Sequence, residues 1–466
     1  MPRPPNILLV VIDAARRDAF SPYDPGACTP TVAGLARRGV AVENAFATAP
    51  WTLPSHVAMF TGALACEFGL DQAPGGDPRG VADTLVDCRE RLLAHRLGEA
   101  GYDTHGLSAN LWVSPHSGLD SGFDRFDYLP SARFDRAFSR RPGTWRSTLA
   151  WAREGFLSAA DSGAARIGAA LERAITDAHP GRPQFWFVNL VEAHSPYLPP
   201  RPFNDLATPG RVAAALDCHR RLSFEAIALA AAGAGTPPRP VLGRLAHLHR
   251  RAVAYTDAWL AGVLATLART GRLADTLVIV TSDHGECFGE EGLIAHGFHL
   301  LDCLVRVPLV AAGPGAERFP QGDDAVSLQA LAPLLWAVAG LEEPSARTGA
   351  VAAGVAVAHS APLCRADDAR MLDFTERWSL SAAQVARLTA DRWLATDGQR
   401  RLELTDGHPL SPPTDATDAR LLTALTQARE GGAAAPTPAQ PPGPAGEETE
   451  ATVAALERQM RLLGYL

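Results

Sequence analysis

Four short apolar runs constrain the fold of this chain more than any other feature. Each is continuous, rich in β-branched residues and as long as one strand: NILLVVI at 6–12, QFWFVNLV at 184–191, TLVIVT at 276–281 and VPLVAA at 307–312. Such runs are typical of strands buried on both faces of a parallel sheet. Helical patterns separate them at 29–39, 83–101 and 251–271. The sequence therefore predicts an α/β fold with a doubly wound, mostly parallel sheet flanked by helices.

The rest of the chain predicts additions to a main domain that spans 1–345. Helical segments at about 130–175 and 200–245 are interpreted as inserts that cover one end of the sheet. The pattern weakens beyond 345, and alternation around Asp-Gly turns in 384–407 indicates an antiparallel sheet. We therefore expect a small C-terminal α+β subdomain at 346–430. A Pro/Ala/Gly-rich linker at 431–450 is predicted to be disordered, and an amphipathic helix at 451–466 to dock back onto the body.

Composition limits the possible binding partners and the cellular compartment of the protein. The formal net charge of −8 argues against nucleic acid or an anionic membrane as a partner. No run approaches the roughly 20 apolar residues of a membrane span, and the N-terminal run is too short for a signal peptide. The seven cysteines are odd in number and form no C-x-x-C pair, which favours a reduced, cytoplasmic setting. All basic residues are arginine, so no lysine can act in a site. The oligomeric state stays open.

Acidic and imidazole side chains follow three of the predicted strands. Asp13 comes directly after the first run, Asp283 and His284 follow TLVIVT, and His194 follows QFWFVNLV. In open parallel sheets ligands bind outside the carboxyl ends of the strands. We therefore expect these side chains to lie at one edge of the sheet.

Each of these residues also has an ordinary structural interpretation. Asp13 could cap the next helix, and His194 could be a loop histidine stacked on Tyr197. Thr52 lies in the stretch APWTLPSHVAMFTG (49–62), where a threonine before Pro54 could simply cap a helix. The adjacent pair Asp283-His284 followed by glycine is harder to explain by packing alone.

Taken together, these groups form a plausible shell for one divalent metal ion. Two carboxylates, an imidazole and the hydroxyl of Thr52 suit Zn, Mn or Ca. A bound cation would lower the pKa of the Thr52 hydroxyl and make it a nucleophile. The N-terminus of the helix that follows Thr52 would stabilise an incoming anion. The sequence therefore predicts a metal-dependent site that binds a small anionic molecule.

The longer motifs resemble the sulfatase branch of the alkaline phosphatase superfamily. The resemblance runs from about 5 to 345, with a weaker echo in 384–407, and it rests on PNILLVVIDAARRDAF, APWTLPSHVAMFTG, VEAHSPYLPP, VTSDHGECFGEEGLIAHGFHLLDCLVRVPLV and the final LLGYL. It implies that Asp13, Asp283 and His284 are metal ligands and that Thr52 stands at the nucleophile's position. It implies that His194 contacts the anionic group or the leaving oxygen. His296 stands where many sulfatases have a lysine.

The departures from the family pattern decide the chemistry. Threonine cannot become the formylglycine of ordinary sulfatases, because its β-carbon carries a methyl group. His56 replaces the arginine that braces the nucleophile, and Ala14 replaces a second acidic residue. Two-zinc phosphodiesterases of the superfamily need an Asp-x-x-x-His element, but Leu190 stands four residues before His194. One metal ion is therefore expected.

The resulting hypothesis is a metal-dependent hydrolase of phosphate or phosphonate esters with a covalent phospho-threonine intermediate. Thr52, His194, His296 and His56 are the candidate catalytic residues, and Arg16 and Asn110 are candidate substrate-binding residues. Three alternatives stay open: a sulfate-ester hydrolase that acts without formylglycine, a phosphotransferase, and a non-catalytic family member that binds a metal or anion.

Overall fold

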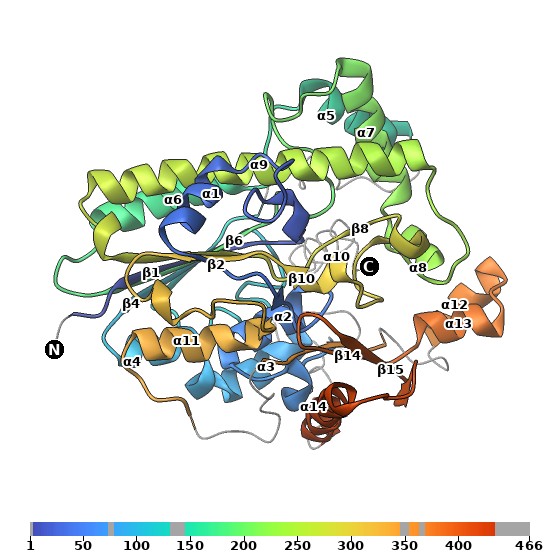
Figure 1. Ribbon diagram of the computed structural model, residues 1–466. Coiled ribbons are helices and arrows are strands. Elements are labelled where there is room, and N and C mark those ends of the chain that lie inside the picture. Colours follow the sequence, from blue (N-terminus) through green and yellow to red (C-terminus); the bar gives the residue numbers. More distant parts are fainter. Residues whose placement is uncertain (1–2, 73–78, 131–144, 345–353, 363–368, 434–466) are drawn as a thin grey trace, which may run out of the picture.

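A seven-stranded sheet forms the centre of the protein (Figure 1). The computed structural model describes residues 3–72, 79–130, 145–344, 354–362 and 369–433. The strand order of the central sheet is β2 (Val40–Ala41), β11 (Leu309–Ala312), β7 (Thr276–Thr281), β1 (Asn6–Ile12), β6 (Gln184–Leu190), β4 (Asp103–Ser108) and β5 (Arg125–Tyr128). The five strands from β7 to β5 are parallel, which confirms the predicted α/β fold with a mostly parallel sheet.

One predicted strand has the opposite direction. β11, from the run at 307–312, pairs antiparallel with β7, and β2 pairs antiparallel with β11. A parallel neighbour needs a crossover connection, usually a long helix. Between β7 and β11 the chain has only short elements, including the four-residue α10 (Asp302–Val305), so it returns along β7 in the opposite direction.

Helices cover both faces of the sheet (Figure 1). Leu8, Val10 and Ile12 of β1 pack toward α1 (Pro30–Arg38), α6 (Ala164–Asp177) and α9 (Arg239–Arg269). The alternate residues Ile7, Leu9 and Val11 pack toward α2 (Thr52–Thr61), α3 (Arg79–Asp87), α4 (Leu93–Glu99) and α11 (Leu331–Val338). Both faces of β1 are therefore buried, which explains its continuous apolar sequence.

The segments predicted as inserts divide into two groups. α6 covers the sheet through Ile167, Leu171 and Ile175. α5 (Trp145–Leu157) and α7 (Thr208–Arg221) pack against each other beside one end of α9 instead (Figure 1). The helices approach closely at Gly155, where an added Cβ would lie 2.6 Å from the carbonyl oxygen of Arg211. α8 (Phe224–Ala231) follows α7.

A small antiparallel sheet lies in the C-terminal part of the chain. Its order is β13 (Ala356–Ser360), β14 (Arg392–Thr396), β15 (Arg401–Thr405) and β16 (His408–Pro409). The predicted Asp-Gly turns join its strands: Gly398, Asp406 and Gly407 all have positive φ. α14 (Ala416–Ala433) packs against this sheet, so 431–433 belong to a helix. The rest of the predicted linker and the predicted docking helix lie outside the described residues.

The remaining elements are short or peripheral. They are β3 (Ala45–Phe46), β8 (Cys287–Phe288), β9 (Ile294–Ala295), β10 (Arg306–Val307), β12 (Val326–Ser327), α12 (Ala369–Trp378) and α13 (Ala382–Leu388). Within the described ranges, no helix is both long enough and apolar enough to span a membrane.

Candidate active site and metal centre

The ends of β1 and β7 bring three potential metal ligands together. Asp13 follows β1, while Asp283 and His284 follow β7, which is the hydrogen-bonded neighbour of β1. All three residues are fully buried, and one ligand atom from each lies within 4.8 Å of the others. Nε2 of His284 is 3.5 Å from Oδ1 of Asp13 and 3.6 Å from Oδ2 of Asp283. The sheet edge therefore gathers these residues as the sequence predicts.

The hydrogen bonds of the two carboxylates leave one oxygen of each for a cation. Oδ2 of Asp13 accepts from the side-chain amide of Asn110, and Oδ1 of Asp283 accepts from the backbone N–H of Ala14 and of His284. Oδ1 of Asp13 and Oδ2 of Asp283 are buried and have no hydrogen-bond partner among the described residues. Buried, unpartnered carboxylate oxygens are costly unless a cation binds them. This donor set fits one divalent metal ion.

The electrostatics of the cluster support this assignment. Burial raises the pKa of Asp13 to about 6 and that of Asp283 to about 7, and the neighbouring Asp283 also contributes to the shift of Asp13. Burial lowers the pKa of His284 to about 3. Its Nδ1–H donates to the carbonyl of Gly285 at 2.9 Å, which leaves the Nε2 lone pair facing the carboxylates. A neutral imidazole held in this way is a suitable metal ligand.

Thr52 faces this cluster from the N-terminus of α2. It is the first residue of the ten-residue helix, and Trp51 occupies the N-cap position without a side-chain capping bond. The Thr52 side chain is therefore not the helix cap. Its Oγ1 lies 3.5 Å from Nε2 of His284, and the residue is fully buried. The backbone N–H groups of a helix's first turn lack intrahelical partners and favour an anion nearby.

Two further histidines lie close to His284. His194 follows β6 and His296 follows β9. The ring of His296 lies 4.4 Å from that of His284 and 4.9 Å from that of His194, measured between centroids. The Nδ1–H of His194 donates to the carbonyl of Ser195 at 2.9 Å. The structure thus brings both predicted histidines to the candidate metal cluster.

Sequence reasoning missed the residue that holds His296 in place. Glu286, two positions after His284, is fully buried. Its Oε1 lies 2.8 Å from Nδ1 of His296, and its Oε2 accepts from the hydroxyl of Tyr197 at 2.7 Å. Burial raises the pKa of Glu286 and lowers that of His296. The only feature of the sequence that could have indicated this role is an acidic residue so close to the Asp283-His284 pair.

His56 lies behind Thr52, one turn further along α2. Its Nδ1–H donates to the carbonyl of Thr52 at 2.9 Å and lies 3.5 Å from Oδ2 of Asp283. Its Nε2 accepts from the side-chain amide of Asn189, a second residue that sequence reasoning missed. Burial lowers the pKa of His56 to about 3. This geometry suits a neutral group that positions Thr52 and Asp283, not the cation that an arginine would supply.

The two candidate substrate-binding residues have different positions. Asn110 follows β4, and its side-chain amide donates to Oδ2 of Asp13, so it positions a candidate metal ligand. Arg16 pairs with Asp18 at 2.7 Å and with Glu290, and it donates to the backbone oxygen of Glu286 at 3.0 Å. These anions raise the pKa of Arg16 above its usual value. In its described contacts, the guanidinium of Arg16 therefore binds acidic side chains and a backbone oxygen beside the cluster and none of the three candidate metal ligands.

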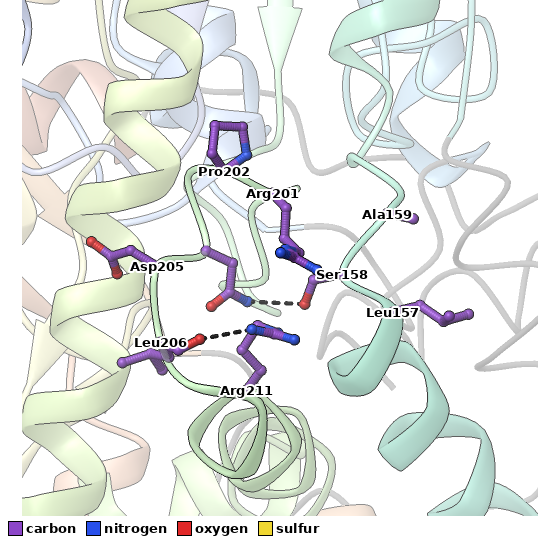
Figure 2. A pocket seen from close by; sticks show the side chains of 9 residues that line it. Leu157, Ser158, Ala159, Arg201, Pro202, Asp205, Leu206 and Arg211 are labelled. Carbon is purple, nitrogen blue, oxygen red and sulfur yellow. Dashed lines mark hydrogen bonds between the residues drawn. The ribbon is translucent and has the colours of Figure 1, made fainter.

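A hollow of about 550 Å³ lies between the end of α5 and the segment that leads into α7 (Figure 2). It is lined by Leu157, Ser158, Ala159, Arg201, Pro202, Asn204, Asp205, Leu206 and Arg211. Nη1 of Arg211 donates to the carbonyl of Leu206 at 2.8 Å, and Nδ2 of Asn204 donates to Oγ of Ser158 at 3.2 Å (Figure 2). Two arginines, Arg201 and Arg211, therefore line this hollow together with the end of α5.

Comparison with known proteins gives consistent matches. The model of the family described as Sulfatase matches residues 5–341. An uncharacterized sulfatase, YidJ, from Escherichia coli (strain K12) is 24% identical over 369 residues, which cover 74% of this chain and 70% of the relative. The choline-sulfatase of Rhizobium meliloti (strain 1021) is 25% identical over 339 residues, which cover 67% of this chain and 63% of the relative.

Solved structures share the fold at low sequence identity. A phosphonate monoester hydrolase of Agrobacterium radiobacter aligns with a TM-score of 0.56 and 19% identity over 99% of this chain and 96% of the other. A phosphonate monoester hydrolase from Silicibacter pomeroyi aligns with a TM-score of 0.60 and 16% identity over 91% and 95% of the two chains.

Proposed function

Because the chain belongs to the sulfatase family, whose members are metal-dependent hydrolases, we propose that it hydrolyses phosphate or phosphonate esters with Thr52 as the nucleophile. The observation that carries the proposal is the position of Thr52. Its hydroxyl lies at the N-terminus of α2 and 3.5 Å from the histidine of the candidate metal cluster. The fold is one that phosphonate monoester hydrolases also have, so it is compatible with attack at phosphorus.

Asp13, Asp283, His284 and Thr52 would hold the metal ion, for which Zn, Mn or Ca is the expected choice. When bound, such a cation lowers the pKa of a coordinated hydroxyl and neutralises charge on the ester oxygens. Burial raises the pKa of both Asp13 and Asp283, so without a cation these carboxyl groups hold their protons more tightly than usual, and a bound cation would replace those protons.

The protein's own groups then account for the reaction. Oγ1 of Thr52 would attack phosphorus while a neutral imidazole over the cluster, such as that of His296, takes up its proton. An Oγ1–P bond forms, and the P–O bond to the leaving alcohol breaks in line. His194 and His296 lie over the cluster, where they can stabilise the equatorial oxygens and pass the proton taken from Thr52 to the leaving oxygen. Water then attacks the phospho-threonine, which releases phosphate and restores the Thr52 hydroxyl.

Sulfate-ester hydrolysis is the second candidate, and the family match favours it. Thr52 cannot provide formylglycine, so a sulfatase of this sequence would need either threonine itself or water as the nucleophile. The two candidates therefore differ in whether a covalent adduct on Thr52 forms with a phosphorus ester.

The test is turnover of p-nitrophenyl phosphate, bis-p-nitrophenyl phosphate and p-nitrophenyl sulfate with added Zn, Mn or Ca. Intact-protein mass spectrometry during turnover would detect the phosphoryl adduct. We expect Thr52→Ala to lose both turnover and adduct, and Thr52→Ser to keep some of each. Thr61→Ser, at the other end of α2, is the matched control. Near-normal turnover in Thr52→Ala would refute the covalent mechanism, and turnover of the sulfate ester alone would favour the second candidate.

A further inference from the structure

Two cysteine thiols meet beside the candidate active site. Cys287 lies in β8, three residues after His284, and Cys303 lies in α10. Their Sγ atoms are 3.4 Å apart. Cys287 is 1% exposed, whereas Cys303 is only partly buried. Of the two residues, Cys303 is therefore the one that we expect a small reagent to reach first.

Backbone contacts, not side-chain packing alone, bring the two segments together. The N–H of Gly285 donates to the carbonyl of Leu304 at 2.7 Å, and the N–H of Glu286 donates to the carbonyl of Cys303 at 3.0 Å. An added Cβ at Gly285 would lie 2.0 Å from the carbonyl oxygen of Cys303, so only glycine allows this approach. The sulfur atoms are therefore close because the main chain holds them close.

We propose that Cys287 and Cys303 form a reversible disulfide site whose oxidant is a low-molecular-weight disulfide. A disulfide bond is about 2.05 Å long, so the sulfur atoms must approach by roughly 1.4 Å. Small rotations of the two side chains can supply that movement while the backbone hydrogen bonds stay in place. The 15 residues between the cysteines carry His296, so the new bond closes a loop that belongs to the candidate active site.

The reaction proceeds by thiol–disulfide exchange. The thiolate of the accessible Cys303 attacks one sulfur of the small disulfide and expels a thiolate. Cys287 then loses its proton and attacks Sγ of Cys303, and the second small thiolate leaves. The two cysteines lose two electrons and two protons in total, and the small disulfide becomes two thiols.

A metal ion is the rival occupant, because Glu290 lies near both thiols. Both oxygens of its carboxylate already have partners. Oε1 pairs with Arg16, and Oε2 accepts from the backbone N–H of Phe288 at 2.6 Å. A metal would have to displace these donors and lie beside a guanidinium. The contacts therefore favour a dithiol over a metal site.

The sequence makes the test simple. The chain contains no lysine, so trypsin cleaves only after arginine, and residues 273–306 form one peptide with Cys287 and Cys303 as its only cysteines. The full-length protein is incubated with oxidised glutathione, and its remaining thiols are alkylated after denaturation. The protein is then digested with trypsin, and the peptide masses are measured by mass spectrometry. We expect this peptide to become about 2 Da lighter than its dithiol form and to take up no alkylating reagent. Added dithiothreitol should reverse the change.

The exposed Cys28 is the internal control, since it is the only cysteine of peptide 18–37. It should carry glutathione as a mixed disulfide. In Cys287→Ser we expect the mixed disulfide to persist on Cys303, because the resolving thiol is absent. Two outcomes would overturn the proposal: peptide 273–306 that carries only glutathione or free thiols in the wild-type protein, or stoichiometric added zinc that protects the accessible Cys303 from alkylation in the native protein.

Discussion

The candidate metal cluster and the arginine-lined hollow differ in what positions their polar groups. Asp13, Asp283 and His284 follow neighbouring parallel strands, and the sheet register places them together. Arg201 and Arg211 lie on a loop and on α7, and Arg211 is fixed largely by backbone carbonyls (Figure 2). The cluster leaves carboxylate oxygens for a ligand, whereas Arg211 joins segments of the protein. We infer that chemistry is concentrated at the sheet edge and that the hollow is mainly architectural.

The strongest test of this contrast removes one carboxylate from the cluster. Asp283→Asn should lose the stoichiometric metal ion, and turnover should fall by about 10⁴-fold or more, because an amide is a weaker ligand than a carboxylate. Metal content by plasma mass spectrometry and turnover of the best ester would be measured together. Asp257→Asn is the control: this buried aspartate caps α1 through the N–H groups of Thr31 and Val32. It should cost about 1 kcal/mol of stability and keep the metal. Full metal content in Asp283→Asn would contradict the assignment.

The next test concerns Glu192, a buried residue that belongs to neither region. It follows β6, and its Oε1 accepts from the backbone N–H groups of Ser162 and Ala164. Burial raises its pKa from 4.5 to about 8. The folded protein therefore keeps a proton that the unfolded chain has lost, so stability falls as the pH rises from about 4.5 to about 8. This residue accounts for on the order of 5 kcal/mol across that interval, at 1.36 kcal/mol per pKa unit.

Glu192→Gln cannot titrate, so it isolates this contribution from those of the other acids. Urea unfolding between pH 4.5 and 8.5 should show that the free energy of unfolding of the variant increases relative to that of the wild type as the pH rises. A constant difference would mean that Glu192 is already ionised in the folded protein. Turnover should change little, because the side chain holds the start of α6 and none of its described contacts is to the metal cluster.

Glu286→Gln should have a smaller effect, and on catalysis instead of stability. The amide can still contact His296 and Tyr197, but it no longer supplies the charge that favours a proton on Nδ1 of His296. We expect kcat to fall by about 10²-fold with a changed pH profile, while KM and metal content stay near the wild-type values. If Glu286→Gln behaves like Glu192→Gln in turnover, then Glu286 only fills space.

These residues also show how far the sequence could predict the structure. Strand composition predicted the sheet. The positions that follow the strands predicted that Asp13, Asp283, His284 and His194 would lie near one another, because parallel strands end at one edge of the sheet. The antiparallel direction of β11 could not be predicted, since a buried strand has the same composition in either direction. Glu286, Tyr197 and Asn189 were missed because their roles depend on contacts between segments far apart in the chain. Residue roles and the cytoplasmic setting stay predictions.

The smallest expected effect concerns the hollow. Arg211 is 7% exposed and donates to the carbonyl of Leu206, to Oγ1 of Thr208 and to the carbonyl of Phe156. Arg211→Met should leave these acceptors unpaired and lower the free energy of unfolding by about 1–3 kcal/mol. Turnover of a small p-nitrophenyl ester should stay within about twofold of the wild-type value. Arg201→Met, in the same hollow but at an exposed position, should change stability by less than about 0.5 kcal/mol.

Urea unfolding and steady-state kinetics on metal-loaded protein would separate the two regions. Loss of turnover in Arg211→Met with the metal retained would show that the hollow acts in catalysis, and the contrast with the sheet edge would fail. A loss with the natural substrate but not with the small ester would sharpen the contrast instead. The hollow would then bind a distant part of the substrate, while bond breaking stays with Thr52 and the groups at the strand ends.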